Sequence, residues 1–205
     1  MRPIEFILGP YDGADTDYLS TAQSYATAGA LVLTDTLTLA PASFPTITSD
    51  GDEGGNIFTF YGKNNSGQDI SVGLTGPNSD TAVATLAFAS IDSITISNTS
   101  AGNVSAGFAQ GGATDWIPLD LYNPNQTTTI SVTNDGTVNY SVVYTNENPW
   151  QSAYNPTEVA HPAAALTGAS SSQTASTQVL MRAVRFKMNS GSGSIRCTIT
   201  QQSTQ

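Results

Sequence analysis

The sequence predicts an all-β protein made of two tandem antiparallel β-sandwich-like units, of jelly-roll or immunoglobulin-like type, with little helix. Apolar and polar residues alternate with a period of two in several segments, as in half-buried strands. Turns rich in Gly, Asn and Ser separate those segments. Only 11% of the 205 residues are charged, so the Lys- and Glu-rich surface of a helical protein is missing.

We predict the first unit over residues 30–110. Alternation begins in ALVLTDTLTLA, residues 30–40, and continues through PTITS. Further on, NIFTFYGKNNSGQDISVGL predicts a hairpin that turns at KNNSGQ. Phe58 and Phe60 share one face of its first strand, and Ile57 and Tyr61 lie on the other. A strand that is apolar on both faces should be central in its sheet.

The first unit should end with a second hairpin. Residues 93–108, SITISNTSAGNVSAGF, contain two strand-like runs around a small polar turn. The Gly-rich residues 109–114 that follow are the predicted boundary between the units.

We predict the second unit over residues 111–205. Asn134-Asp135-Gly136 lies between two alternating runs and is the strongest hairpin signal in the chain. Residues 184–199, VRFKMNSGSGSIRCTI, repeat the pattern of 93–108 and predict a matching closing hairpin. Residues 146–177 are irregular and predict a long loop, in which 157–168 could form a short helix.

Residues 1–29 are predicted to form an N-terminal arm. Its apolar run, Ile4–Leu8, is bounded by Pro3 and Pro10. Two interpretations are open: an edge strand of the chain's own sheet, or a segment that docks on a neighbouring subunit.

Nothing in the motif content predicts an enzyme. His161 is the only histidine and Cys197 the only cysteine, and neither has an activating motif beside it. Patterns typical of hydrolases, zinc proteases and nucleotide-binding loops are missing. We therefore expect no catalysis, no disulfide, and a buried structural thiol at Cys197.

Composition also limits the partners. A net charge of −10 argues against specific nucleic-acid binding, because phosphates are recognised by clustered Lys and Arg. No segment approaches the ~18 consecutive apolar residues of a membrane span, and the N-terminal run is short for a signal peptide. We expect no membrane association and no classical secretion.

One acidic turn is a weak candidate for calcium. Asp50, Asp52 and Glu53 are closely spaced oxygen ligands among glycines, but the distal glutamate of an EF-hand loop is missing. The alternative is a solvated acidic turn. We expect no other cofactor.

Candidates for partner contact are apolar, aromatic or basic. Trp116 and Trp150 could stack on sugars, or serve the core or an interface. Arg185 and Lys187 should share one strand face, either solvated or facing an acidic neighbour. The predicted contacts are Ile4, Phe6, Leu8, Trp150, Tyr154, Arg182, Arg185 and Lys187.

Two long stretches resemble structural proteins of tailed double-stranded DNA bacteriophages. The first is TITSDGDEGGNIFTFYGKNNSGQDISVGLTGPN followed by IDSITISNTSAGNVSAGF. The second runs from WIPLDLYNPNQTTTISVTNDGTVNYSVVYTNENPW to RAVRFKMNSGSGSIRCTITQ. The similarity covers residues 18–202, with Gly76-Pro77-Asn78 and NSGSGSI matching well. Val72 departs from the pattern, where an acidic residue is expected.

This resemblance implies a virion component without enzymatic activity, most like a head decoration (cement) protein. Such a protein would be made in the host cytoplasm and would bind the major capsid protein or other virion subunits on the capsid surface. It would act as a homo-oligomer, a dimer or a trimer. The alternatives are a tail, collar or neck protein, and a glycan- or receptor-binding module.

Overall fold

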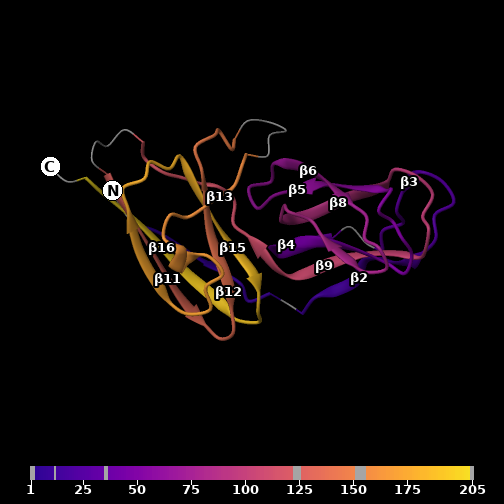
Figure 1. The fold of residues 1–205 in the computed structure, drawn as a ribbon, viewed down its shortest axis with the longest axis horizontal. Coiled ribbons are helices and arrows are strands. Elements are labelled where there is room, and N and C mark those ends of the chain that lie inside the picture. The colour runs from indigo at the N-terminus through magenta and orange to yellow at the C-terminus, as the bar shows by residue number, and fades with distance from the viewer. Residues whose placement is uncertain (1–2, 12, 35–36, 122–125, 151–155, 204–205) are drawn as a thin grey trace. The chain divides into compact units, whose positions relative to one another are not determined.

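The computed structural model describes residues 3–11, 13–34, 37–121, 126–150 and 156–203. It confirms the all-β prediction: these residues form strands and one short 3-10 helix, η1 (Ala164–Leu166) (Figure 1). The chain divides into two compact units. Unit 1 joins Met1–Tyr11 to Ala113–Gln205, and unit 2 is Asp12–Gly112.

This division corrects the predicted N-terminal arm, residues 1–29. Strand β1 (Ile4–Leu8) pairs antiparallel with β16 (Ser194–Ser203), so the first residues belong to unit 1. The rest of the predicted arm, from Asp12 to residue 29, belongs to unit 2. Of the two interpretations of the apolar run Ile4–Leu8, the edge strand of the chain's own sheet is confirmed. The backbone of β1 forms its hydrogen bonds with β16 of the same chain.

Unit 1 contains two antiparallel groups of strands. The first, in order of pairing, is β1, β16, β11 (Gln126–Asp135) and β14 (Gln173–Thr177). The second is β13 (Val159–Ala160), β12 (Asn139–Thr145), β15 (Ala183–Ser190) and β10 (Ile117–Pro118). The two groups share one core, which includes Ile130, Val132 and Ile199 from the first and Val142 and Phe186 from the second. Unit 1 is therefore a β-sandwich.

The two hairpins predicted in this half are wrong. Strand β11 pairs with β16 and β12 pairs with β15, so both turns carry the chain from one group of strands to the other. The turns also pack together: Gly193 donates its N–H to the Thr137 carbonyl at 2.9 Å. A Cβ on Gly193 would collide with the carbonyl oxygen of Asp135. Asn-Asp-Gly indicates a reversal of the chain, but not which strands will pair after it.

Unit 2 contains eight described strands. They are β2 (Asp15–Gln23), β3 (Gly29–Ala30), β4 (Leu37–Ser49), β5 (Ile57–Lys63), β6 (Asp69–Thr75), β7 (Thr81–Val83), β8 (Phe88–Ile96) and β9 (Val104–Ala113), the last ending one residue inside unit 1. The main order is β9-β4-β8-β5-β6, with β2 on β9, β3 on β8 and β7 on β4. Phe58, Phe60 and Phe88 lie at the centre of its core.

The predicted hairpin at residues 57–74 is confirmed as β5 and β6. β5 is central as expected, between β8 and β6. Its outer face is exposed to solvent, however, since Ile57 and Tyr61 each remain 44% exposed.

The strand predicted from residue 31 begins only at Leu37, but it extends through PTITS to Ser49.

The hairpin predicted at residues 93–108 is wrong, because β4 lies between β8 and β9. The matching hairpins that suggested two similar units are therefore missing from both halves. The Gly-rich segment 109–114 does not interrupt the strand, since β9 continues to Ala113. The predicted boundary nevertheless lies within it, because unit 2 ends at Gly112 and unit 1 resumes at Ala113. The predicted loop 146–177 holds β13, η1 and β14, and η1 is the helical element described within 157–168.

Candidate functional site

The three predicted contacts of the N-terminal run serve the chain's own core. Leu8 is buried, while Ile4 and Phe6 pack against the core of unit 1. The ring of Phe6 meets that of Phe186 edge-on, with 4.8 Å between centroids. This is a correction: alternate side chains of β1 are used within the sandwich, leaving Ile7 on the exposed face.

Arg185 and Lys187 do share one face of β15, opposite the buried Val184 and Phe186. Their acidic neighbour belongs to the same chain. Glu158 accepts from Arg185 Nη1 at 3.1 Å and from Lys187 Nζ at 2.7 Å. The expected acidic partner on a neighbouring molecule is therefore not needed. Glu158, Arg185 and Lys187 form an ion-pair network within the chain.

Arg185 has further partners. Its Nε donates to the Thr114 carbonyl at 2.8 Å, and its guanidinium lies 5.4 Å from the centre of the Trp116 ring. Only 5% of the residue is exposed. A buried cation requires such partners, because desolvation otherwise disfavours its charge. Trp116 is half-buried with this cation against it, so its ring is no open platform for a sugar.

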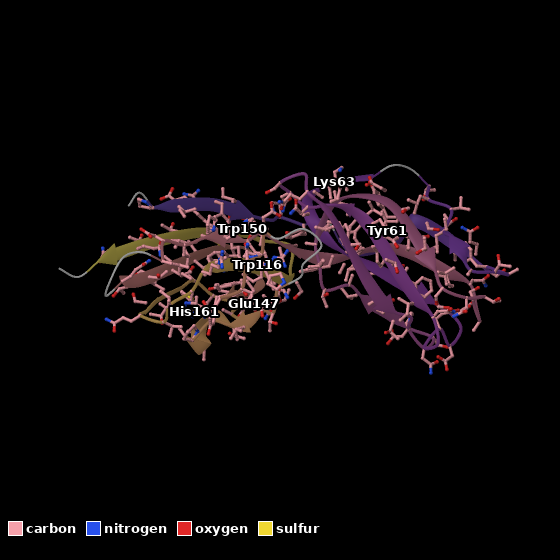
Figure 2. The ribbon with its side chains drawn as sticks, turned by 90° about the horizontal axis from the view of Figure 1, so that it is seen from above. Tyr61, Lys63, Trp116, Glu147, Trp150 and His161 are labelled. Carbon is pink, nitrogen blue, oxygen red and sulfur yellow. The ribbon has the colours of Figure 1, made fainter. Side chains whose placement is uncertain are left out.

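The network and one further carboxylate hold the described residues on either side of positions 151–155. Glu158 directly precedes β13 and holds the returning chain to β15. At the other end, Glu147 Oε2 accepts from the Thr157 N–H at 2.9 Å. Trp150, labelled with Glu147 in Figure 2, lies between these ties with 41% of its surface exposed. Tyr154 lies outside the described residues.

Other exposed apolar side chains lie on segments that strand pairing and backbone hydrogen bonds join to the end of β12. Arg182 connects the segments, since its carbonyl accepts from Leu119 N–H and its N–H donates to the Thr145 carbonyl, both at 3.0 Å. The half-buried Arg182 side chain makes no ion pair with a described residue. We call this surface the apolar end of unit 1; it consists of Leu121, Trp150, Val159, Val179 and Leu180.

Sequence reasoning found Trp150 and missed the other four residues of the apolar end. Val179 and Leu180 are adjacent, and an adjacent apolar pair outside a strand can be a signal of exposure. Leu121 and Val159 carry no such signal. Their segments are joined to the others only by the hydrogen bond from Leu119 to Arg182 and by the pairing of β13 with β12.

The acidic turn does not form a calcium site in the structure. Glu53 is fully buried, and its carboxylate accepts from Ser49, from the Asn56 side chain at 2.6 Å, and from two backbone N–H groups at 2.8 and 2.9 Å. Asp50 accepts from Asn103, and that hydrogen bonding lowers the pKa of its carboxyl. Asp52 accepts from the Gly54 N–H.

These carboxylates therefore hold loops together instead of facing a cation. Among the residues that the structure describes, no group of three His, Cys, Asp or Glu side chains could hold a metal ion.

His161 and Cys197 are both buried in unit 1. The Nδ1 of His161 accepts from the Ala163 N–H at 3.1 Å, whereas its Nε2 is buried without a partner among the described residues. Burial lowers the pKa of this imidazole. Cys197 is a buried free thiol, as predicted, and burial raises its pKa well above the usual range.

The open face of unit 2 is the other exposed feature that the sequence did not single out. Tyr61 points outward from β5, with Ser71 of β6 and Ser93 of β8 directly across from it. Lys63, labelled beside Tyr61 in Figure 2, forms an ion pair with Asp69 on the same face.

Comparison with known proteins adds no relative: no family model, no curated protein and no solved structure matches the chain. In the described part of the chain, no helix has the length and apolar character needed to cross a membrane.

Proposed function

We propose that the protein is a structural component of a bacteriophage virion, a decoration protein that binds and stabilises the head shell. The apolar end of unit 1 is the observation that carries this proposal. Five large apolar side chains are exposed on joined segments of unit 1, and exposed apolar surface of this kind is typical of a protein interface.

The construction of this end suits docking on a rigid lattice. Carboxylates hold the described residues that flank Trp150 in sequence: Glu147 accepts from the Thr157 N–H, and Glu158 pairs with Lys187. Binding groups that are held in place before binding lose less conformational entropy when a partner docks. Aromatic anchors of this kind account for a large part of the binding energy in many interfaces. Arg182, beside Leu180, adds a cation suited to a carboxylate at the edge of the partner's surface.

A protein that binds only the assembled shell stabilises it by mass action. Each copy contributes one interface, and the repeated lattice multiplies the effect over many sites. A net charge of −10 helps to keep free copies apart in solution before they bind.

The test is the number and position of copies in purified virions of the phage that encodes the chain. Quantitative mass spectrometry and cryo-electron microscopy should find many copies distributed over the head. A handful of copies at the tail vertex would favour the alternative, a tail, collar or neck protein. Complete absence from the particle would overturn both.

A paired variant tests the surface itself. Trp150→Ala with Leu180→Ser should lower the number of bound copies, because both side chains belong to the apolar end. Val32→Ser is the matched control, since Val32 is equally apolar and 65% exposed but lies in unit 2. Equal loss of binding in both variants would show that the apolar end is not the docking surface.

A further inference from the structure

The outer face of β8, β5 and β6 in unit 2 is lined by hydroxyl groups around an aromatic ring. Tyr61 lies between Ser71 and Ser93 in one row across the three strands. Thr59 and Thr95 lie side by side in the next row. Neighbouring strands are ~4.8 Å apart, so this face presents hydroxyls at regular intervals on both sides of the ring. We call these five residues the hydroxyl face.

The hydroxyls of this face have no partners in the molecule. Tyr61, Ser71, Ser93, Thr59 and Thr95 make no side-chain hydrogen bond with any described residue. All five side chains are exposed or half-buried. They are therefore free to donate to, and accept from, a bound molecule.

Unit 1 provides an internal contrast. Its first group of strands also presents Thr and Ser side chains in register, but these bond to each other. Thr129 pairs with Ser176 at 2.8 Å, and Ser131 with Thr174 at 2.9 Å. No aromatic ring lies among those four residues. Hydroxyl groups in register on neighbouring strands can therefore bond to each other in this protein, and those of the hydroxyl face do not.

Charge narrows the class of ligand. Unit 2 contains ten acidic residues and one basic residue, Lys63, which is already paired with Asp69 on this face. An anionic polymer would meet a strongly anionic unit without a free cation, and would be repelled. The charge of unit 2 therefore disfavours an anionic partner, and the hydroxyl groups around Tyr61 match an uncharged partner that is itself rich in hydroxyl groups.

The chemistry of a sugar polymer matches these groups. One face of a pyranose ring carries C–H groups that are attracted to the negative face of an aromatic ring, and its edge carries hydroxyls. We propose that the hydroxyl face of unit 2 binds a neutral polysaccharide, with Tyr61 stacked on one sugar ring and Ser71 and Ser93 bonding to its hydroxyls. This proposal is independent of shell binding, which uses unit 1.

The experiment is native affinity electrophoresis of the full chain in gels that contain dextran, mannan or a soluble β-glucan, with alginate as the anionic comparator. We expect at least one neutral polymer to retard the protein and alginate not to do so. Tyr61→Ala should weaken the retardation about fivefold, since loss of a stacked ring costs about 1 kcal/mol. Tyr61→Phe should retain most of the binding.

Two matched controls separate this site from others. Tyr18 is also 44% exposed and also in unit 2, but it lies on β2 and packs edge-on against Phe108. Trp150→Ala removes the exposed indole of unit 1. Both Tyr18→Ala and Trp150→Ala should bind like the unchanged chain.

Three results would overturn the proposal: no retardation by any of the neutral polymers, equal retardation by alginate, or a Tyr61→Ala variant that binds as before. Should Tyr61→Ala fail to fold, Ser71→Ala with Ser93→Ala provides the same test without removing an apolar group, and should still weaken binding severalfold. None of these results depends on whether the protein is found on the head.

Discussion

The two units have the same kind of secondary structure but very different charge. Unit 1 carries six acidic and five basic residues, a net of −1, whereas unit 2 carries ten acidic residues and one basic, a net of −9. Together they account for the chain's −10. Nearly all of the acidity that dominates the composition is therefore a property of one unit.

The units also use their charges differently. In unit 1, Glu158, Arg185 and Lys187 form a network that attaches a loop to β15, with Arg185 almost fully buried. In unit 2, Glu53 is buried and accepts neutral donors, while Lys63 and Asp69 pair on the surface. In unit 1, ion pairs hold residues next to exposed apolar side chains. In unit 2, the outer face of β8, β5 and β6 is polar and exposed to solvent.

The substitution with the largest expected effect tests whether the two units unfold independently of each other. Glu53→Ala removes the acceptor for four hydrogen bonds and should destabilise unit 2 by about 3 kcal/mol or more. Both tryptophans lie in unit 1, so tryptophan fluorescence reports on that unit alone. Hydrogen exchange should rise across residues 13–112, and the fluorescence transition should stay unchanged.

The loss of stability that tryptophan fluorescence reports for unit 1 could instead equal the loss that hydrogen exchange reports for unit 2. That result would show that the two units unfold together. Glu53→Gln is the matched variant. It keeps the shape of the side chain but places an amide beside N–H donors, so it should also destabilise unit 2, by less than the alanine variant.

The stacked turns of unit 1 provide the second test. Gly193→Ala places a Cβ against the Asp135 carbonyl and should destabilise unit 1 by about 2 kcal/mol, because backbone has to shift. Urea unfolding followed by far-ultraviolet circular dichroism, which reports on the strands of both units, measures this. Gly29→Ala is the control, since a Cβ there meets nothing within 4 Å; an equal effect of the two substitutions would contradict the packing of the turns.

The third test compares the two ion pairs. Glu158→Gln leaves the buried Arg185 without its carboxylate and should cost unit 1 about 1–3 kcal/mol. Asp69→Asn breaks the exposed pair with Lys63 in unit 2 and should leave stability almost unchanged. Chemical unfolding at low and high salt measures both, and equal losses would contradict the assigned roles.

The smallest expected effect is on how the stability of unit 1 depends on pH. Burial lowers the pKa of His161 in the folded state, so below the ordinary imidazole value of about 6.5 the unfolded chain binds the extra proton more readily. Stability should therefore fall as pH drops below about 6.5, and His161→Gln should remove that part of the fall. Melting followed by tryptophan fluorescence between pH 7.5 and 5 measures it; an unchanged profile in the variant would assign the fall to other groups.

Much of the local structure was predictable. The period-two alternation correctly located β5, β6, β8, β15 and β16, because alternate burial is a property of each strand alone. The same argument placed Arg185 and Lys187 on one face, and the position of Cys197 in an apparent strand predicted its burial. The candidate site was predictable only at Trp150, since a large aromatic in an irregular segment can be recognised without knowing its neighbours.

The sequence by itself thus determined the all-β class, the central position of β5 and the shared face of Arg185 and Lys187 on β15. Only the tertiary structure decided that β4 lies between β8 and β9, that β1 joins the second half of the chain, and that Glu158 is the partner of Arg185. The physical reason is the same in each case. Alternation and turn residues act within a few positions, whereas strand pairing and ion pairing depend on free energies between segments far apart in the chain.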